Sequence, residues 1–190
     1  MNKSSDKNLS DKELGYLVGF YIGDGYSYHS KKDRHYVVEF FLNKKRDRQI
    51  ITYLIRLLSL LKLKTFKQRD KRYNSIRIKI NSKKFMLFIR DETSKFKKNN
   101  LNNKEYAMGF LSGFIDAEGY VNNGEIQLTQ KDKEILEHIK KICKTLKIPV
   151  RKFWSSENYK SKNKIWRLRI STIFKNLKHN SCKVKRAYPN

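Results

Sequence analysis

LGYLVGFYIGDGY (residues 14–26) recurs 94 positions later as MGFLSGFIDAEGY (residues 108–120). In both stretches a small residue returns at every fourth position: Gly15, Gly19 and Gly23, then Gly109, Gly113 and Ala117. Residues four apart lie on one face of a helix, so each stretch predicts a helix with a stripe that lacks side chains. Because an interior glycine costs about 1 kcal/mol relative to alanine, the repeated stripe predicts that the two helices pack directly against each other.

Each of these helices ends in an acid, Asp24 in the first and Glu118 in the second. A carboxylate at a helix C-terminus is unfavourable, because the helix dipole is negative there. If the helices pack in parallel, the two acids converge, and like charges in one place favour a bound cation. Mg²⁺ suits a site with few carboxylates that water and phosphate oxygens complete. The alternative is a pair of solvated carboxylates. Gly25 and Gly119 are expected to end the helices in a left-handed conformation.

The similarity between the two halves continues after the helices. VVEFFLNKKRDRQI (37–50) resembles EIQLTQKDKEIL (125–136), and IRIKINSKKF (76–85) resembles WRLRISTIFK (166–175). We therefore divide the chain into a polar tail (1–9), a first unit (10–92), a linker (93–103), a second unit (104–180) and a basic tail (181–190). Apolar periodicity predicts α+β units of order αββαββα. The expected elements are helix 10–24, strands 26–30 and 36–43, helix 47–61, strands 64–69 and 76–80 and helix 82–90; then helix 104–116, strands 120–121 and 125–130, helix 133–146, strands 150–155 and 165–171 and helix 172–178.

The charge of the chain predicts a polyanionic partner. Its 190 residues hold 44 Lys and Arg against 18 Asp and Glu, a net charge of +26. Residues 1–103 carry +15 and residues 104–190 carry +11, so each half is basic alone. Nucleic acid is the first candidate and an anionic membrane surface the second. A hydrophobic content of 38% with 13% aromatic residues argues against disorder.

Other classes fit poorly. No stretch approaches the ~20 apolar residues of a membrane helix, and no helix is both basic and amphipathic over such a length. The polar N-terminus has no signal core, so we expect a cytoplasmic protein, with organellar encoding left open. Cys143 and Cys182 do not form a CxxC pair, which argues against zinc and a disulfide framework. Cys143 is expected to be a core residue, and Trp154 and Trp166 are expected to take part in packing rather than in base stacking.

The motifs LVGFYIGDG (17–25) and LSGFIDAEG (111–119) resemble the nine-residue signature of LAGLIDADG homing endonucleases. The two copies make the chain similar to the compact single-chain, intron-encoded enzymes of archaea, over residues 10–180. That resemblance implies two pseudo-symmetric units packed through the motif helices. It also implies curved, four-stranded antiparallel sheets that form a saddle over double-stranded DNA, in a monomer. Ile22 stands where the signature has its earlier Asp, whereas the second motif keeps Asp116, at a position that is usually structural.

The same resemblance implies the roles of the site residues. Two or more Mg²⁺ ions would be bound by Asp24 and Glu118, with Gly23 and Ala117 beside them. Asn43 and Gln130, each followed by a lysine (Lys44 and Lys131), match the polar and basic positions around the metal-bound water. A further basic residue is expected after the second strand pair, and the candidates are Lys97, Lys98, Lys183 and Lys185.

The surface for DNA is expected on the strands, where basic residues alternate with apolar ones and so share one face of a sheet. The candidates are Lys67, Arg69, Arg77, Lys79, Arg151, Arg167 and Arg169. Because the two copies differ at these positions, the expected target is asymmetric. For any single strand, an ordinary solvated face is the alternative.

These observations predict a site-specific endonuclease that makes a double-strand break by Mg²⁺-dependent phosphodiester hydrolysis, leaving short 3′ overhangs. The alternative is a non-cleaving relative, either an intron RNA maturase or a DNA-binding regulator. The presence of both acids favours cleavage.

Overall fold

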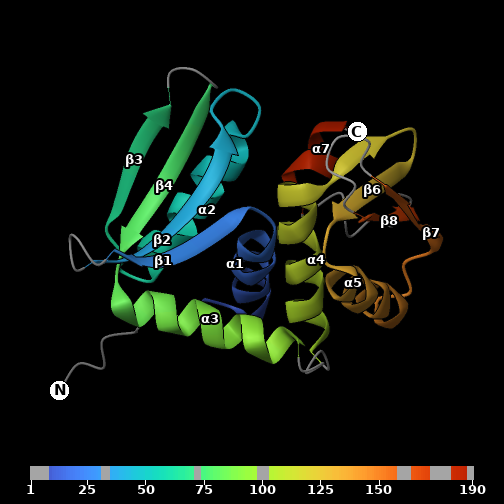
Figure 1. The fold of residues 1–190 in the computed structure, drawn as a ribbon, viewed down its shortest axis with the longest axis horizontal. Coiled ribbons are helices and arrows are strands. Elements are labelled where there is room, and N and C mark those ends of the chain that lie inside the picture. Colours follow the sequence, from blue (N-terminus) through green and yellow to red (C-terminus); the bar gives the residue numbers. More distant parts are fainter. Residues whose placement is uncertain are drawn as a thin grey trace.

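The computed structural model describes residues 9–30, 35–70, 74–97, 103–157, 164–171 and 181–187. They form two units of the same topology that meet at helices α1 (Asp11–Asp24) and α4 (Lys104–Glu118). One four-stranded sheet lies on each outer side of this helix pair (Figure 1). The α+β class and the doubled arrangement are as predicted.

The first unit follows the predicted order of elements. After α1 come β1 (Gly25–Ser30), β2 (His35–Asn43), α2 (Arg48–Leu60), β3 (Thr65–Asp70), β4 (Ser75–Asn81) and α3 (Lys83–Lys97). The strands are antiparallel in the order β1-β2-β4-β3. Ile76, Ile78 and Ile80 on β4 are buried, whereas Arg77 and Lys79 between them are partly exposed. This alternation gives the sheet one core face and one polar face.

The second unit repeats the pattern with shorter strands at its start. After α4 come β5 (Tyr120–Asn122), β6 (Glu125–Gln130), α5 (Lys133–Thr145), β7 (Val150–Glu157) and β8 (Lys164–Ser171), in the sheet order β5-β6-β8-β7. Ile126, Leu128, Leu168 and Ile170 are fully buried, and so is Cys143 of α5, as predicted. The expected helix at 172–178 lies outside the described residues.

The stripe of small residues is the contact surface between α1 and α4. A Cβ atom on Gly19 would overlap the carbonyl of Phe110, and one on Gly113 would overlap the carbonyl of Tyr16. Further along, Gly23 faces the side chain of Ala117. The contacts advance in the same direction on both helices, so the helices are parallel and their C-termini meet. Direct contact between backbones explains why the glycines are needed here.

The glycines that end the two helices differ from the prediction. Gly25 has φ −97° and Gly119 has φ −77°, so both are extended rather than left-handed. Glycine is required there for space. A Cβ on Gly25 would overlap Tyr21 in the preceding turn, and one on Gly119 would crowd Ile115.

Two segments also differ from the predicted organisation. Helix α3 continues to Lys97 and takes up the first part of the segment expected to be linker. Within the expected basic tail, residues 182–187 form a further helix, α7 (Cys182–Ala187). Ser181 and Val184 are buried, so this segment is a packed part of the second unit rather than a tail.

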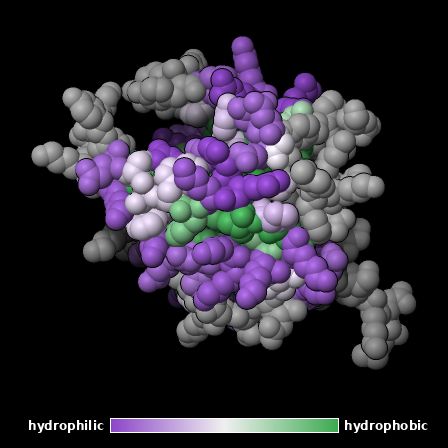
Figure 2. Space-filling model, turned by 90° about the vertical axis from the view of Figure 1, so that its right-hand side faces the viewer, coloured by the Kyte–Doolittle hydropathy of each residue, from purple (hydrophilic) through white to green (hydrophobic). Residues whose placement is uncertain are grey.

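One face of the molecule shows how its polar and apolar side chains are distributed. The face that the second unit turns outward is mostly hydrophilic around one apolar area (Figure 2). Within the described ranges, every helix is too short or too polar to cross a bilayer.

Candidate metal site and DNA-facing surface

The two motif acids lie together where α1 and α4 end. A Cβ on Gly23 would lie 3.1 Å from Cγ of Glu118, which places the two helix ends in contact. Burial and the nearby charge of Glu118 raise the pKa of Asp24 to about 7, and Asp47 adds to this while Lys183 opposes it. Burial also raises the pKa of Glu118, again against Lys183. The sequence predicted this convergence of like charges.

Lys183 brings a cation to the same place. Its Nζ donates hydrogen bonds to the carbonyl of Ala117 (2.8 Å) and to that of Gly119 (3.1 Å). Burial lowers the pKa of this lysine, against the opposing charges of Asp47, Asp116, Asp24 and Glu118. Of the four expected basic candidates, Lys183 is thus the one that the structure places at the acids. Lys98 lies outside the described residues, as do the side chains of Lys97 and Lys185.

Asp116 anchors the segment that carries Lys183. Its Oδ1 accepts hydrogen bonds from Ser181 Oγ (2.8 Å) and the Lys183 N–H (2.8 Å). Its Oδ2 accepts from the Cys182 N–H (3.0 Å) and from the hydroxyl of Tyr16 in the first unit (2.8 Å). Burial raises the pKa of Asp116, and these four hydrogen bonds oppose that shift. The acid is therefore structural, in agreement with the role implied for its position.

The two expected polar partners of the acids behave differently. Gln130 donates through Nε2 to Oε1 of Glu118 at 3.0 Å. The side chain of Asn43 instead accepts from the backbone N–H groups of Lys45 (3.0 Å) and Arg46 (2.9 Å), and so closes the turn after β2. Asn43 and Gln130 were predicted to have the same role, but only Gln130 forms a hydrogen bond with a motif acid. Lys44 and Lys131 are both exposed.

Oxygen donors of the kind that Mg²⁺ prefers are gathered at the junction. Asp24 and Glu118 are the last residues of their helices and follow Gly23 and Ala117, so carboxylate and backbone carbonyl groups occur together at the helix ends. Among the residues that the structure describes, no group of three or more His, Cys, Asp and Glu forms a self-sufficient metal site. Two carboxylates that repel each other fit a divalent cation that phosphate and water complete. The residues present therefore fit the expected ion.

The polar face of the first sheet carries some of the expected basic residues. Arg77 and Lys79 share this face with Phe41 and Glu39, their partners on β2. Lys79 forms an ion pair with the buried Glu39 at 3.3 Å, and the guanidinium of Arg77 lies 5.3 Å from the centre of the Phe41 ring. The register pairs Lys67 with Ile78 and Arg69 with Ile76, which directs both to the opposite face. Those two residues are therefore not part of this surface.

The corresponding face of the second sheet is formed by β7 and β8. Arg167 pairs with Trp154 and Arg169 with Lys152. The guanidinium of Arg169 lies 5.3 Å from the Trp154 ring centre and also forms an ion pair with Glu125 at 3.2 Å. Trp154 thus lies on the polar face, where it packs against the side chains of Lys152 and Arg169.

Two further residues of this sheet complete the comparison with the predictions. Trp166 stacks on Phe153, with ring centres 5.6 Å apart, and packs against the core as predicted. Arg151 is exposed at an irregularity in the register of β7, between Val150 and Lys152.

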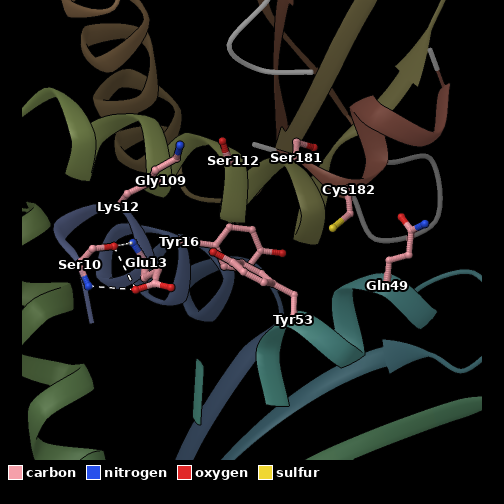
Figure 3. A pocket seen from close by; sticks show the side chains of 10 residues that line it. All are labelled: Ser10, Lys12, Glu13, Tyr16, Gln49, Tyr53, Gly109, Ser112, Ser181 and Cys182. Carbon is pink, nitrogen blue, oxygen red and sulfur yellow. Dashed lines mark hydrogen bonds between the residues drawn. The ribbon is translucent and has the colours of Figure 1, made fainter. Parts of the chain in front are cut away.

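Two hollows lie near the junction. One, of about 380 Å³, is bounded by the turn after β2, the start of β5 and helix α7, and its lining includes Asp47, Gly119 and Lys183. The other, of about 530 Å³, lies between α1, α2, α4 and the segment before α7 (Figure 3). Tyr16, Tyr53 and Cys182 line it, and neither motif acid does. Neither motif acid lines the first hollow either, but Lys183 and Gly119 bring that hollow next to the candidate metal site, from which the second hollow is separate.

Comparisons with known proteins agree with this architecture. A family model for the LAGLIDADG-like domain matches residues 105–175. An uncharacterized protein of Methanocaldococcus jannaschii, MJ0398, is 30% identical over 151 residues, which is 77% of this chain and 54% of that protein. The chain therefore spans about half the length of that relative.

Solved structures show the same fold. A variant of the homing endonuclease I-DmoI matches with a TM-score of 0.71 and 19% identity, covering 91% of this chain and 96% of that one. I-DmoI in complex with DNA and Mn matches with a TM-score of 0.66 and 21% identity, over 85% and 90% of the two chains. The N-terminal LAGLIDADG domain of DUF199/WhiA matches with a TM-score of 0.60 and 17% identity, over 98% and 97%. The chain has the two-unit LAGLIDADG fold.

Proposed function

We propose that this chain, with its doubled LAGLIDADG motif and the matching two-unit fold, is a site-specific endonuclease that cleaves both strands of a DNA duplex. The observation that carries the proposal is the meeting of Asp24 and Glu118 at the ends of two parallel helices. Two partly buried acids of like charge that lie together favour a bound cation. Two pseudo-symmetric acids suit two scissile phosphodiester bonds, one in each strand.

The metal would be held by the carboxylates of Asp24 and Glu118, with the carbonyls of Gly23 and Ala117. When bound, Mg²⁺ polarises a phosphate and activates a water for hydrolysis. Gln130 holds the carboxylate of Glu118 in place through its 3.0 Å hydrogen bond. Lys183 adds a positive charge near the developing charge on the phosphate. Two or more ions, and Mg²⁺ rather than another divalent metal, are part of this proposal.

The polar faces of the two sheets would contact the DNA. Arg77, Arg167 and Arg169 can donate to guanine in the major groove, while Lys79 contacts phosphate. The exposed Phe41 offers an apolar contact of the kind that recognises a thymine methyl. The two faces differ in composition, which supports an asymmetric target read by one monomer. Short 3′ overhangs and a cytoplasmic location remain predictions from the sequence.

One observation favours the alternative, a non-cleaving DNA-binding regulator or RNA maturase. The ammonium of Lys183 donates a hydrogen bond to the carbonyl of Ala117 at 2.8 Å. A protein that only binds nucleic acid could use this lysine as a permanent replacement for the ion.

The test is incubation of the purified protein with DNA that spans the uninterrupted host-gene locus, once with Mg²⁺ and once with EDTA. The proposal predicts one double-strand break with Mg²⁺ and none with EDTA. Binding to that DNA without any cut under Mg²⁺ would support the non-cleaving alternative and contradict the nuclease.

A further inference from the structure

The ammonium of Lys183 lies at a backbone oxygen that the metal would also use. It donates to the carbonyls of Ala117 and Gly119 at 2.8 and 3.1 Å. Carboxylates from both units surround it electrostatically: Asp24 and Asp47 from the first, Asp116 and Glu118 from the second. Carbonyl oxygens together with carboxylates are also the surroundings that a hard divalent cation prefers.

The position of this ammonium is fixed by the backbone as well as by the side chain. The Lys183 N–H is held by Asp116 at 2.8 Å, next to the N–H of Cys182 at 3.0 Å. At the other end of α7, Arg186 donates to the carbonyl of Arg46 in the turn after β2. Helix α7 is therefore tied both to the second motif and to the first unit, which keeps the backbone of Lys183 close to the motif end.

The described residues of the first unit place no equivalent cation at its motif, and Lys98 and the side chain of Lys97 lie outside the described residues. Among the described residues, no side chain donates to the carbonyl of Gly23, the counterpart of Ala117. The helix that follows the first sheet, α3, packs along α1 and β2 instead of over the motif end. Ile22 occupies the place of Asp116 and packs against the core, so it offers no acceptor for such a segment.

We propose that Lys183 is a built-in counter-ion that occupies the position of a metal ion at the Ala117 carbonyl. A divalent ion would then bind first on the side of Gly23 and Asp24, and an ion on the side of Ala117 must displace the ammonium. A divalent ion on that oxygen and the ammonium beside it would repel each other, and this repulsion is stronger in a partly buried site than in water. The proposal rests on the proposed function in that it requires the acid pair to bind metal.

A simpler role for Lys183 gives a different expectation. Lysine often donates to the last carbonyls of a helix and complements the helix dipole. If Lys183 only caps α4, replacing it weakens the fold but does not strengthen metal binding.

The experiment is a titration of the DNA-free protein with Mn²⁺, followed by electron paramagnetic resonance, in the wild type, K183M and K144M. Lys144 lies on the exposed surface of α5, so K144M makes the same change in net charge far from the acids. We expect the second Mn²⁺ ion to bind K183M about tenfold more tightly than the wild type, while K144M stays unchanged.

The outcomes separate this inference from the function. If the wild type and K183M bind Mn²⁺ equally well, Lys183 does not act as a counter-ion in place of a metal ion, but the proposed metal site stands. If neither protein binds Mn²⁺, the counter-ion role of Lys183 and the proposed metal site are both wrong. If K183M does not fold without metal, K183Q replaces it, since its amide still donates to the carbonyl but carries no charge. Mn²⁺ should then raise the Tm of K183Q more than that of the wild type, and an equal rise overturns the inference.

Discussion

The two units have the same order of strands and helices, but they differ at the ends of their motif helices. In the second unit Glu118 accepts a hydrogen bond from Gln130, and the neighbouring carbonyl of Ala117 accepts one from Lys183. In the first unit, the described residues give Asp24 no side-chain hydrogen bond, and Asn43 is used to close its own turn. The two units share the features that the packing of α1 on α4 requires. They differ in the side chains that contact the ends of these two helices.

The pair Ile22 and Asp116 shows the same contrast in the interior. Asp116 receives four hydrogen bonds, three of them from residues 181–183, because the second unit places its C-terminal segment over the motif. Among the residues that the structure describes, no such segment is bound to Ile22, which packs against the apolar core. The departure of the first motif from the signature therefore reflects the different route of the chain after each sheet.

The largest effect is expected where the two units are alike. Gly113→Ala places a methyl group against the carbonyl of Tyr16 and should destabilise the protein by about 3 kcal/mol, because neither backbone can move. The exchange Gly23→Ala with Ala117→Gly only moves one methyl across the interface and should cost under about 1 kcal/mol. Urea unfolding measures both, and equal stability of the wild type and Gly113→Ala would show that the helix backbones are not in contact.

The next effect tests the contrast between Ile22 and Asp116. Asp116→Ala leaves two N–H groups and two hydroxyls without their acceptor and should cost about 3 kcal/mol. Ile22→Ala, at a partly buried position, should cost about 1 kcal/mol. Limited proteolysis should also cut the segment around 181–187 sooner in Asp116→Ala. If both variants lose the same stability, the anchoring role of Asp116 is wrong.

A smaller effect tests whether Gln130 and Asn43 have different roles. Gln130→Ala frees the carboxylate of Glu118 and should lower the cleavage rate about tenfold at unchanged stability. Asn43→Ala should lower the stability by about 1 kcal/mol, because the turn loses two hydrogen bonds, and should change the rate less. Single-turnover cleavage and urea unfolding separate the two. Equal losses of rate would restore the equivalence of the two residues.

The smallest effect concerns the two DNA-facing surfaces. Glu125→Gln removes the ion pair of Arg169 and should raise DNA affinity about threefold. Glu39→Gln removes the ion pair of Lys79 in the same way. Glu39 also accepts a 3.3 Å hydrogen bond from Tyr28, which the amide oxygen of Gln can keep, so we expect a smaller gain in DNA affinity. Fluorescence anisotropy at two salt concentrations measures both. A loss of affinity in Glu125→Gln would show that Glu125 positions Arg169 for DNA.

The features that could be predicted are those with a repeated or periodic signal. The glycine stripes predicted that the two motif helices pack on each other, and the acids at matching positions predicted a shared site on the condition that the helices are parallel, as they are. Alternation placed Arg77 and Lys79 on the polar face, but the register of β3, which turns Lys67 and Arg69 away, has no signal in a single basic strand.

Helix α7 and the role of Lys183 lacked such a signal. A six-residue helix shows less than two turns of periodicity, and in a segment so rich in lysine the buried one cannot be told from its neighbours. The conformation of Gly25 and Gly119 was mispredicted because a helix-ending glycine usually indicates positive φ, whereas here the constraint is the space beside the preceding turn.

The central claim is that Asp24 and Glu118 form one metal-dependent cleavage site for two strands. The most direct test measures DNA binding and double-strand cleavage of the same target for Asp24→Asn and Glu118→Gln, with Mg²⁺. We predict no double-strand product from either variant and target affinity within about threefold of the wild type, because neither acid is needed to hold the DNA-facing sheets. Removing one of two buried like charges should also leave the metal-free fold at least as stable. Undiminished double-strand cleavage by either variant, or loss of DNA binding in both, would contradict the account.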